Sequence, residues 1–307
     1  MRTVRTDLAM ESYSSNQHNT RGVRINTQEE QGIKQTTVYI DTLEAAQRLM
    51  KSCGVFVTIL SDQLPHADCE MQKRMASQIS RTLCKLLPQE GDVMVIGLGN
   101  RHVTADALGA KVVEGTLVTR HLKDNVNHEL LGRLRGVCAV APGVLGVTGM
   151  ETAEVVKGLV ERIHPCAIIA IDALAAMACE RICTTIQITD TGISPGSGVG
   201  NHRLGLTKET LGVPVIAIGV PMVVYAATIA KDALAILSEE MLKGSEQHEA
   251  VLDALFDRLN RGQMGEMIVT PREIDELVQH IAQILAMGIN MALQPRLNPA
   301  EIPMLMH

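Results

Sequence analysis

The sequence predicts an α/β fold with one mainly parallel sheet flanked by helices, and three observations predict it. Short runs rich in Val and Ile alternate with longer stretches of helical periodicity, as in strand–helix–strand units. Several runs, such as VMVIGLG, AIIAID and PVIAIGV, are apolar throughout, which is typical of parallel strands covered on both faces. Hydrophobic residues make up 46% of the 307 residues, enough for a globular core.

The expected elements begin after a polar, loop-rich arm at residues 1–35. Residues 36–307 are expected to form a single domain. The short apolar runs predict strands at Thr36–Ile40, Val55–Leu60, Asp92–Leu98, Gly136–Ala141, Ala167–Ile171, Thr184–Thr189 and Val213–Val220.

The stretches between these runs have helical periodicity, and the last follows a Thr-Pro start signal. They predict helices at Leu43–Lys51, Asp68–Leu87, Asp106–Thr119, Glu151–Ile163, Ala173–Ile182, Met222–Lys243 and Glu273–Leu293. The polar segment Gly244–Glu266 is interpreted as a surface connection with a short helix at Ala250–Leu259.

The composition argues against several classes of protein. Aromatic residues are only 2% of the chain, which disfavours stacking platforms for single-stranded nucleic acid. The net charge of −6 provides no basic footprint, so no direct nucleic-acid partner is predicted. No signal peptide and no membrane span are recognisable, and the seven cysteines do not form a disulfide framework. We therefore expect an intracellular, cytoplasmic protein.

Two aspartates follow two of the predicted strands. Asp106 comes shortly after Asp92–Leu98, and Asp172 comes directly after Ala167–Ile171. Ligands of parallel sheets bind at the carboxyl ends of the strands, where both side chains should project. Two neighbouring carboxyl groups share one proton. The ionised group can act as a base on water, and the protonated group can act as an acid on a leaving nitrogen. The alternative is that both residues merely cap helices, as Asp commonly does.

A glycine-rich segment at residues 189–203, TDTGISPGSGVGNHR, is a second candidate. Asp190, Gly196 and Gly198 could position a substrate chain, because glycines allow close backbone approach. The segment matches neither a Walker loop nor a dinucleotide fingerprint, and a plain tight turn is the alternative.

His121 is a third candidate for substrate positioning, although a histidine at a helix end is also favoured by the helix dipole. The spacing of His and Cys matches no known ligand set, so neither a metal nor another cofactor is predicted.

Long strings of the sequence resemble one known family in order, from about residue 4 to about residue 290. They include VRTDLAMES, VIGLGNRHVTADALGAKVVEGTLVTRHL, APGVLGVTGMETAEVVKGL, AIIAIDALAA, QITDTGISPGSGVGNHR, KETLGVPVIAIGVP and IVTPREIDELV. These strings resemble the spore germination proteases of endospore-forming bacteria.

The resemblance implies an endopeptidase that degrades small acid-soluble spore proteins during germination, located in the forespore or spore core. It implies a fold like that of the hydrogenase-maturation proteases and a homotetramer. The family is regarded as an atypical aspartic protease, and its two implicated aspartates match Asp106 and Asp172.

The resemblance also implies a zymogen that removes its own N-terminal segment. The family's processing pattern is an acidic residue, an apolar residue, Ala, any residue and Glu, and Asp7-Leu8-Ala9-Met10-Glu11 fits it. We therefore expect autocatalytic cleavage between Asp7 and Leu8, which makes residues 1–7 a propeptide.

Two positions depart from the family pattern. Ala105 stands where a Pro usually precedes the first aspartate, and Tyr225 stands where the family usually has an Asp. Two other functions stay open: a metal-dependent peptidase of the maturation type, and a non-catalytic α/β protein whose glycine loops bind a small molecule.

Overall fold

A large mixed sheet organises the computed structural model, which describes residues 8–14, 21–124, 132–194, 204–241, 262, 265 and 267–305. Within these residues the nine-stranded sheet has the order β1-β2-β3-β7-β8-β6-β4-β5, and β9 pairs with β8. The strands are β1 (Val23–Glu30), β2 (Ile33–Ile40), β3 (Gly54–Leu60), β4 (Val93–Gly97), β5 (Val137–Val140), β6 (Ala167–Ala176), β7 (Thr185–Thr189), β8 (Val215–Tyr225) and β9 (Ile268–Val269).

The sheet has a parallel half and an antiparallel half. Strands β5, β4, β6 and β8 pair in parallel. Strands β1, β2, β3 and β7 pair antiparallel with one another, and β7 and β9 are antiparallel to β8. The α/β class is confirmed, and the expected parallel arrangement holds for β5, β4, β6 and β8 but not for the other strands.

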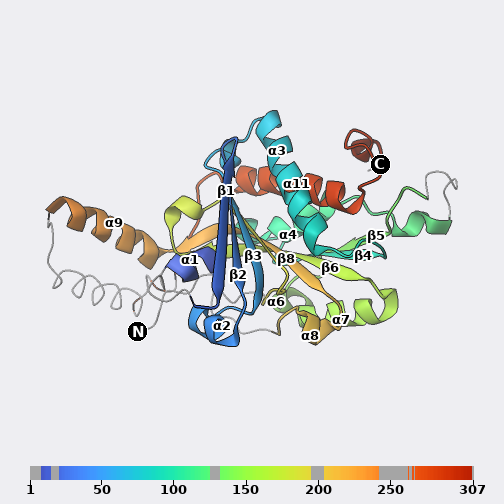
Figure 1. Cartoon of the computed structure of the whole chain (residues 1–307), viewed down its shortest axis with the longest axis horizontal. Helices are drawn as coiled ribbons and strands as arrows, with labels where there is room; N and C mark the ends of the chain where they lie inside the picture. The colour runs from blue at the N-terminus through green and yellow to red at the C-terminus, as the bar shows by residue number, and fades with distance from the viewer. Residues whose placement is uncertain are drawn as a thin grey trace.

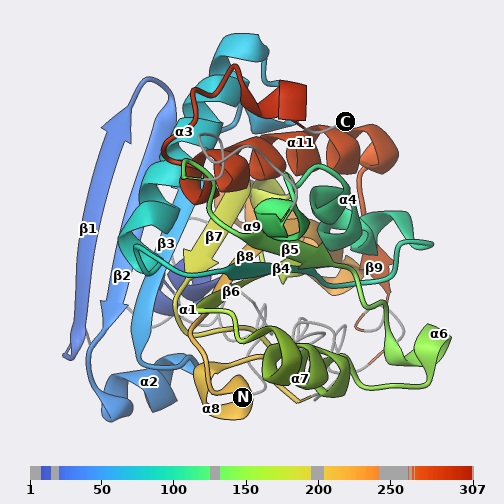
Figure 2. The ribbon, with the colours of Figure 1, turned by 90° about the vertical axis from the view of Figure 1, so that its right-hand side faces the viewer.

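Helices cover both faces of the sheet (Figure 2). The helices α3 (Cys69–Leu86), α4 (Leu108–Glu114) and α11 (Ile274–Leu293) lie over one face. The other face carries α1 (Ala9–Ser14), α2 (Leu43–Leu49), α6 (Leu145–Thr148), α7 (Thr152–Ile163) and α8 (Lys208–Leu211). The helix α9 (Ala226–Met241) extends away from the sheet (Figure 1).

The cores are aliphatic, as the low aromatic content requires. In α3, Met71, Met75, Ile79 and Leu83 recur at helical spacing and are buried in the larger core together with much of α11. Asp68 caps α3 by accepting a hydrogen bond from the Met71 amide at 2.8 Å. A second core, on the opposite face of the sheet, packs α7 against β4 and β6.

The alternation of β6 assigns its side chains to these two cores. Ile169 and Ile171 face the α3–α11 core, while Ile168 and Ala170 face the α7 core. Because side chains alternate along a strand, Asp172 and Leu174 lie on the α7 face of the sheet.

Most predicted elements form near their expected bounds, but three predictions are wrong. Residues Ala173–Ile182 are not a helix: β6 continues to Ala176, and only a 3-10 turn, η4 (Cys179–Arg181), follows. The start of the predicted helix Met222–Lys243 is the end of β8. The loop-rich arm contains β1, which forms a hairpin with β2. The connection Gly244–Glu266 and its helix lie almost wholly outside the described residues.

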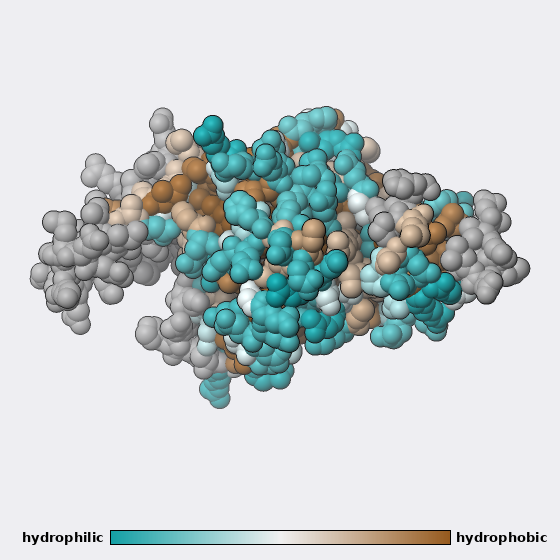
Figure 3. Space-filling view, turned by 90° about the horizontal axis from the view of Figure 1, so that it is seen from above, coloured by the Kyte–Doolittle hydropathy of each residue, from teal (hydrophilic) through white to brown (hydrophobic). Residues whose placement is uncertain are grey.

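The surface is mainly hydrophilic in Figure 3, apart from a hydrophobic area on the side from which α9 extends. Ile229 of α9 and Met267 and Ile268 at β9 are among the exposed large apolar residues. In the described part of the chain, no helix is long and apolar enough to cross a membrane.

Candidate active site

The end of β4 forms a tight turn that positions Asp106. The Leu98 amide donates to the Ile171 carbonyl at 2.8 Å, which ties this turn to β6. Gly99 has a φ of +92°, and a Cβ there would lie 2.0 Å from the Asp106 carbonyl oxygen, so only glycine fits. The Asn100 amide then donates to Asp106 Oδ2 at 2.7 Å. Asp106 is the last residue of the 3-10 helix η2 (Thr104–Asp106), which contacts β6 and β8.

Asp172 lies one residue beyond Ile171, which pairs with Gly97 of β4. Its side chain is 6% exposed, and Oδ1 accepts a hydrogen bond from the Ala173 amide at 2.9 Å. A register shift between Leu174 and Ala175 follows it in β6, and such irregularities are common beside active sites.

The capping interpretation is wrong for both aspartates. The N-cap of α4 is Ala107, with no side-chain cap, and Asp172 lies inside a strand. Asp106 follows the carboxyl end of β4, as expected, whereas Asp172 is not at the end of its strand, because β6 continues for four more residues.

A row of three residues crosses this part of the sheet. Gly219 of β8 pairs with Asp172 of β6 on one side and with Gln187 of β7 on the other. Residues aligned in this way point to the same face of the sheet. The side chains of Asp172 and Gln187 therefore lie on either side of Gly219, which has no side chain, and their Cα atoms are about 10 Å apart. Leu174 leans over this gap, because a Cβ on Gly219 would meet Leu174 Cδ1 at 2.4 Å.

A cavity of about 650 Å³ opens beside this row. Its walls come from α2, β3, β7, β8 and the start of the 190–203 segment. Leu174, Gln187 and Gly219 line it together with Thr191 and Ser194. The cavity is large enough for a few residues of a polypeptide chain.

The N-terminal segment lies next to this cavity. Leu8 is completely buried against Leu174, Ala176 and Val224. The Ala9 amide donates to Gln187 Oε1 at 2.7 Å. Sequence reasoning missed Gln187, although a glutamine within the apolar run TIQIT was a visible signal.

The weaker candidates are not brought to the aspartates. Asp190 Oδ1 accepts from the Val55 amide at 2.8 Å, which joins the end of β7 to the start of β3. His121 is exposed in η3 (Arg120–Asp124), whose Arg120 lies 3.6 Å from Asp92 at the amino end of β4. This is the edge opposite the one that carries Asp106, because Asp92 precedes β4.

Three other predicted positions, Asp7, Gly196 and Gly198, lie outside the described residues. Among the residues that the structure does describe, no group of three His, Cys, Asp or Glu side chains could hold a metal ion.

The two departures from the family pattern lie beside Asp106 and at the end of β8. Ala105 is in η2, directly before Asp106, and packs against the larger core. Tyr225 ends β8 and pairs with Ile268 of β9. Their effect on activity stays a prediction.

Comparison with known proteins decides the family. A sequence model described as germination protease matches residues 3–260. This chain belongs to the germination protease family. It is therefore a protease, and the resemblance to this family is confirmed.

Curated germination proteases match over nearly their whole length. The relative from Caldanaerobacter subterraneus is 43% identical, covering 99% of this chain and 98% of its own. One from Clostridium perfringens is 43% identical over 97% of both chains, and one from Bacillus cereus is 36% identical over 96% of this chain and 95% of its own.

A solved structure, a [NiFe] hydrogenase maturation protease HycI from Thermococcus kodakarensis, also matches. It is 19% identical with a TM-score of 0.32, covering 68% of this chain and 98% of its own. A likeness this weak decides nothing about fold or mechanism.

Proposed function

We propose that this germination protease is an endopeptidase that cleaves small acid-soluble spore proteins with Asp106 and Asp172 as its catalytic pair. Two observations support the proposal: Asp106 follows β4 directly, and Asp172 lies in the strand next to β4, beside residues that line the cavity and hold the buried N-terminal segment. Family membership supports the peptidase activity but does not test the aspartate mechanism.

In this mechanism one carboxylate takes a proton from water while the oxygen adds to the carbonyl carbon of the scissile peptide. The other aspartate, protonated as a carboxylic acid, gives its proton to the leaving nitrogen as the C–N bond breaks. The two residues therefore end each turnover with their protonation states exchanged. The backbone hydrogen bonds from Asn100 to Asp106 and from Ala173 to Asp172 orient the two carboxylates.

We further propose that the chain is made as a zymogen and cuts itself between Asp7 and Leu8. The burial of Leu8 and the hydrogen bond from Ala9 to Gln187 support this, because they hold the residues after the cut beside Asp172. A tethered segment also has a high effective concentration at the site. The spore core as compartment and a homotetrameric assembly are proposed from the resemblance.

The first prediction concerns the aspartate pair. Asp106→Asn and Asp172→Asn should each lower cleavage of a small acid-soluble spore protein by a factor of about 10²–10⁴, since an amide replaces a group that transfers protons. Both variants should also keep residues 1–7, whereas the wild-type chain should begin at Leu8 after processing. Product masses and the N-terminal sequence measure both effects.

Asp41→Asn is the matched control, because Asp41 pairs with Arg24 on the surface at 2.7 Å. It should retain full activity. Full activity of either site variant, with a melting temperature like that of wild type, would remove that residue from the mechanism. Loss of activity with a chelator, restored by one metal, would favour the metal-dependent alternative.

A further inference from the structure

The fold holds residues 8–11 in a defined site, here called the N-terminal seat. It is made by Leu174, Ala176, Met177, Arg181, Gln187 and Val224. Leu8, Ala9 and Glu11 are 0%, 1% and 7% exposed, whereas Met10 is partly exposed. The seat therefore contacts the first, second and fourth residues after the proposed cut most closely.

Two apolar contacts select for size. Leu8 packs on the face of β6 and β8, against the side chains of Leu174 and Val224. Ala9 packs into a different cluster, against α2 and β3, where it is almost fully enclosed. A larger side chain at this second position would overpack the cluster, at a typical cost of about 1–3 kcal/mol.

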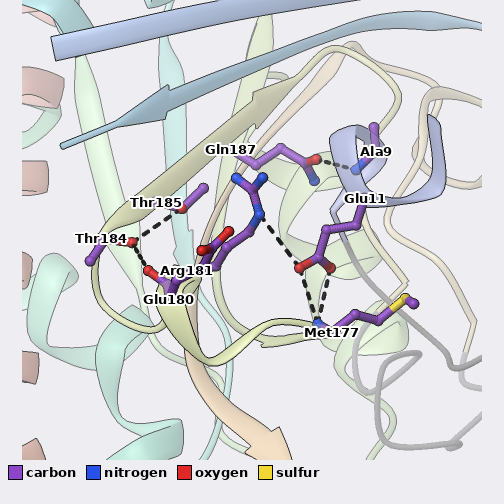
Figure 4. Close-up of polar contacts among 8 residues, drawn as sticks. All are labelled: Ala9, Glu11, Met177, Glu180, Arg181, Thr184, Thr185 and Gln187. Atoms are coloured by element: carbon purple, nitrogen blue, oxygen red, sulfur yellow. Dashed lines mark hydrogen bonds and ion pairs between the residues drawn. The ribbon is translucent and has the colours of Figure 1, made fainter. Parts of the chain in front are cut away.

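The fourth position selects for charge (Figure 4). The Met177 amide donates to both Glu11 oxygens, at 3.1 and 3.0 Å, and Arg181 Nε lies 3.6 Å from Glu11 Oε1. A buried carboxylate with an amide donor and a cation is stable, whereas a neutral residue would leave the guanidinium without its anion.

The backbone of the segment is held by the row of residues that contains Asp172. Gln187 of this row accepts from the Ala9 amide. Leu8 contacts Leu174, which lies two residues beyond Asp172 on the same face of β6. A peptide in the seat is thus anchored through its second residue in the row of Asp172, with its first residue against Leu174.

We propose that the N-terminal seat is the binding site for the substrate residues that follow the cleaved bond, with Arg181 and Gln187 as its specificity-determining residues. The inference rests on the proposed endopeptidase function. The seat takes a polypeptide with an apolar residue, a small residue and, in the fourth position, a glutamate, able to form one helical turn as α1 does. The chain's own residues 8–11 compete with a substrate for it.

The test uses peptide substrates with the sequence of residues 1–14 and the full-length chain as enzyme. With wild type, replacing the peptide's Glu11 with Gln should lower kcat/KM by about tenfold or more, as expected for a lost charged hydrogen bond. Replacing its Met10 with Gln should lower kcat/KM less than this, because Met10 is only partly buried against the cluster around Ala9. In the enzyme, Arg181→Gln should reduce the ratio of kcat/KM for the Glu and Gln peptides to below about threefold, because the variant has no cation to pair with the glutamate.

Two enzyme controls separate recognition from folding. Arg181→Lys should keep part of the preference for Glu, and Arg24→Gln, on the β1–β2 hairpin, should keep all of it. Glu11→Gln in the enzyme itself should raise its rate on the wild-type peptide, because its own segment then competes less well. Unchanged or slower cleavage by this variant would overturn the competition.

The outcomes distinguish the seat from the protease. Equal cleavage of the Glu and Gln peptides, or a preference unaffected by Arg181→Gln, would overturn the proposed role of the N-terminal seat. Neither result would contradict the proposed endopeptidase function. If no peptide is cut, fluorescence anisotropy of a labelled peptide decides: binding weakened by Glu→Gln supports the seat and overturns the proposed function. No cleavage and no binding would overturn both.

Discussion

Asp172 and Gln187 are polar residues inside otherwise buried strands, and each is visible in the sequence as an exception to an apolar run. What the sequence does not contain is the register that aligns them across Gly219. Register follows from packing and from turn geometry, which a single sequence does not reveal. The aspartates could therefore be predicted, while Gln187 and Arg181 could not be placed beside Leu8 and Glu11.

The pH dependence of stability can be traced to another single residue, His280 of α11. Burial lowers the pKa of this imidazole from its ordinary value of 6.5, and the nearby His66 lowers it further, although a backbone hydrogen bond with Leu64 opposes the shift. As the pH falls through 6.5, the unfolded chain takes up this proton before the folded chain does, so stability decreases.

We predict that His280→Gln reduces the difference between the free energies of unfolding at about pH 8 and about pH 5, because the variant has no imidazole to titrate. Urea unfolding at both pH values measures it. A difference as large as that of wild type would show that other groups cause the acid destabilisation.

At the level of elements, two of the three wrong predictions are opposite in kind: one placed a helix where a strand forms, and the other missed a strand. Residues 173–182 contain Ala, Leu and Met, which favour helices, yet the first four of them pair with β8 as a strand. Strand β1 was missed because residues 24–30 are exposed and carry no apolar alternation. In both cases pairing with a neighbouring strand determines the conformation, and local sequence preference does not.

The contact between α4 and β4 depends on glycine. A Cβ on Gly109 would lie 2.4 Å from Leu98 N and O and 2.7 Å from the Ile171 carbonyl oxygen, all of them backbone atoms that cannot move aside easily. We predict that Gly109→Ala destabilises the protein by about 2 kcal/mol or more and reduces activity, because α4 must move away together with Asp106.

Gly158 of α7 is the matched control, because a Cβ there meets nothing within 4 Å. Gly158→Ala should stabilise the protein by about 0.5–1 kcal/mol and leave activity unchanged. Thermal unfolding and peptide cleavage measure both variants. Equal stability of the two would contradict the close approach of α4 to β4.

For the whole molecule, composition and periodicity were enough to predict an α/β fold, and the apolar strands β4, β6 and β8 were recognisable because both of their faces are covered. The antiparallel half was not predicted, since β1 and β2 follow one another as a hairpin with no helix between them. The neighbouring places of β4 and β6, which the aspartates follow or lie in, depended only on the parallel half and could be predicted, although β6 continues past Asp172.

Assembly is the property of the whole molecule that a single chain does not determine. We predict a homotetramer, with a mass about four times the 33.2 kDa of one chain. Light scattering of the full-length protein after size-exclusion chromatography measures it. The mass of one or two chains across the accessible concentration range would contradict the prediction.

The β1–β2 hairpin has a consequence for how the protein behaves at high concentration. β1 forms one edge of the sheet, and an edge strand is a template on which a strand of another molecule can add. Its exposed side chains include Arg24, Glu29 and Glu30, so a strand adding there would have to desolvate charges on β1. The polar side chains that make β1 hard to predict as a strand thus also disfavour aggregation at this edge of the sheet.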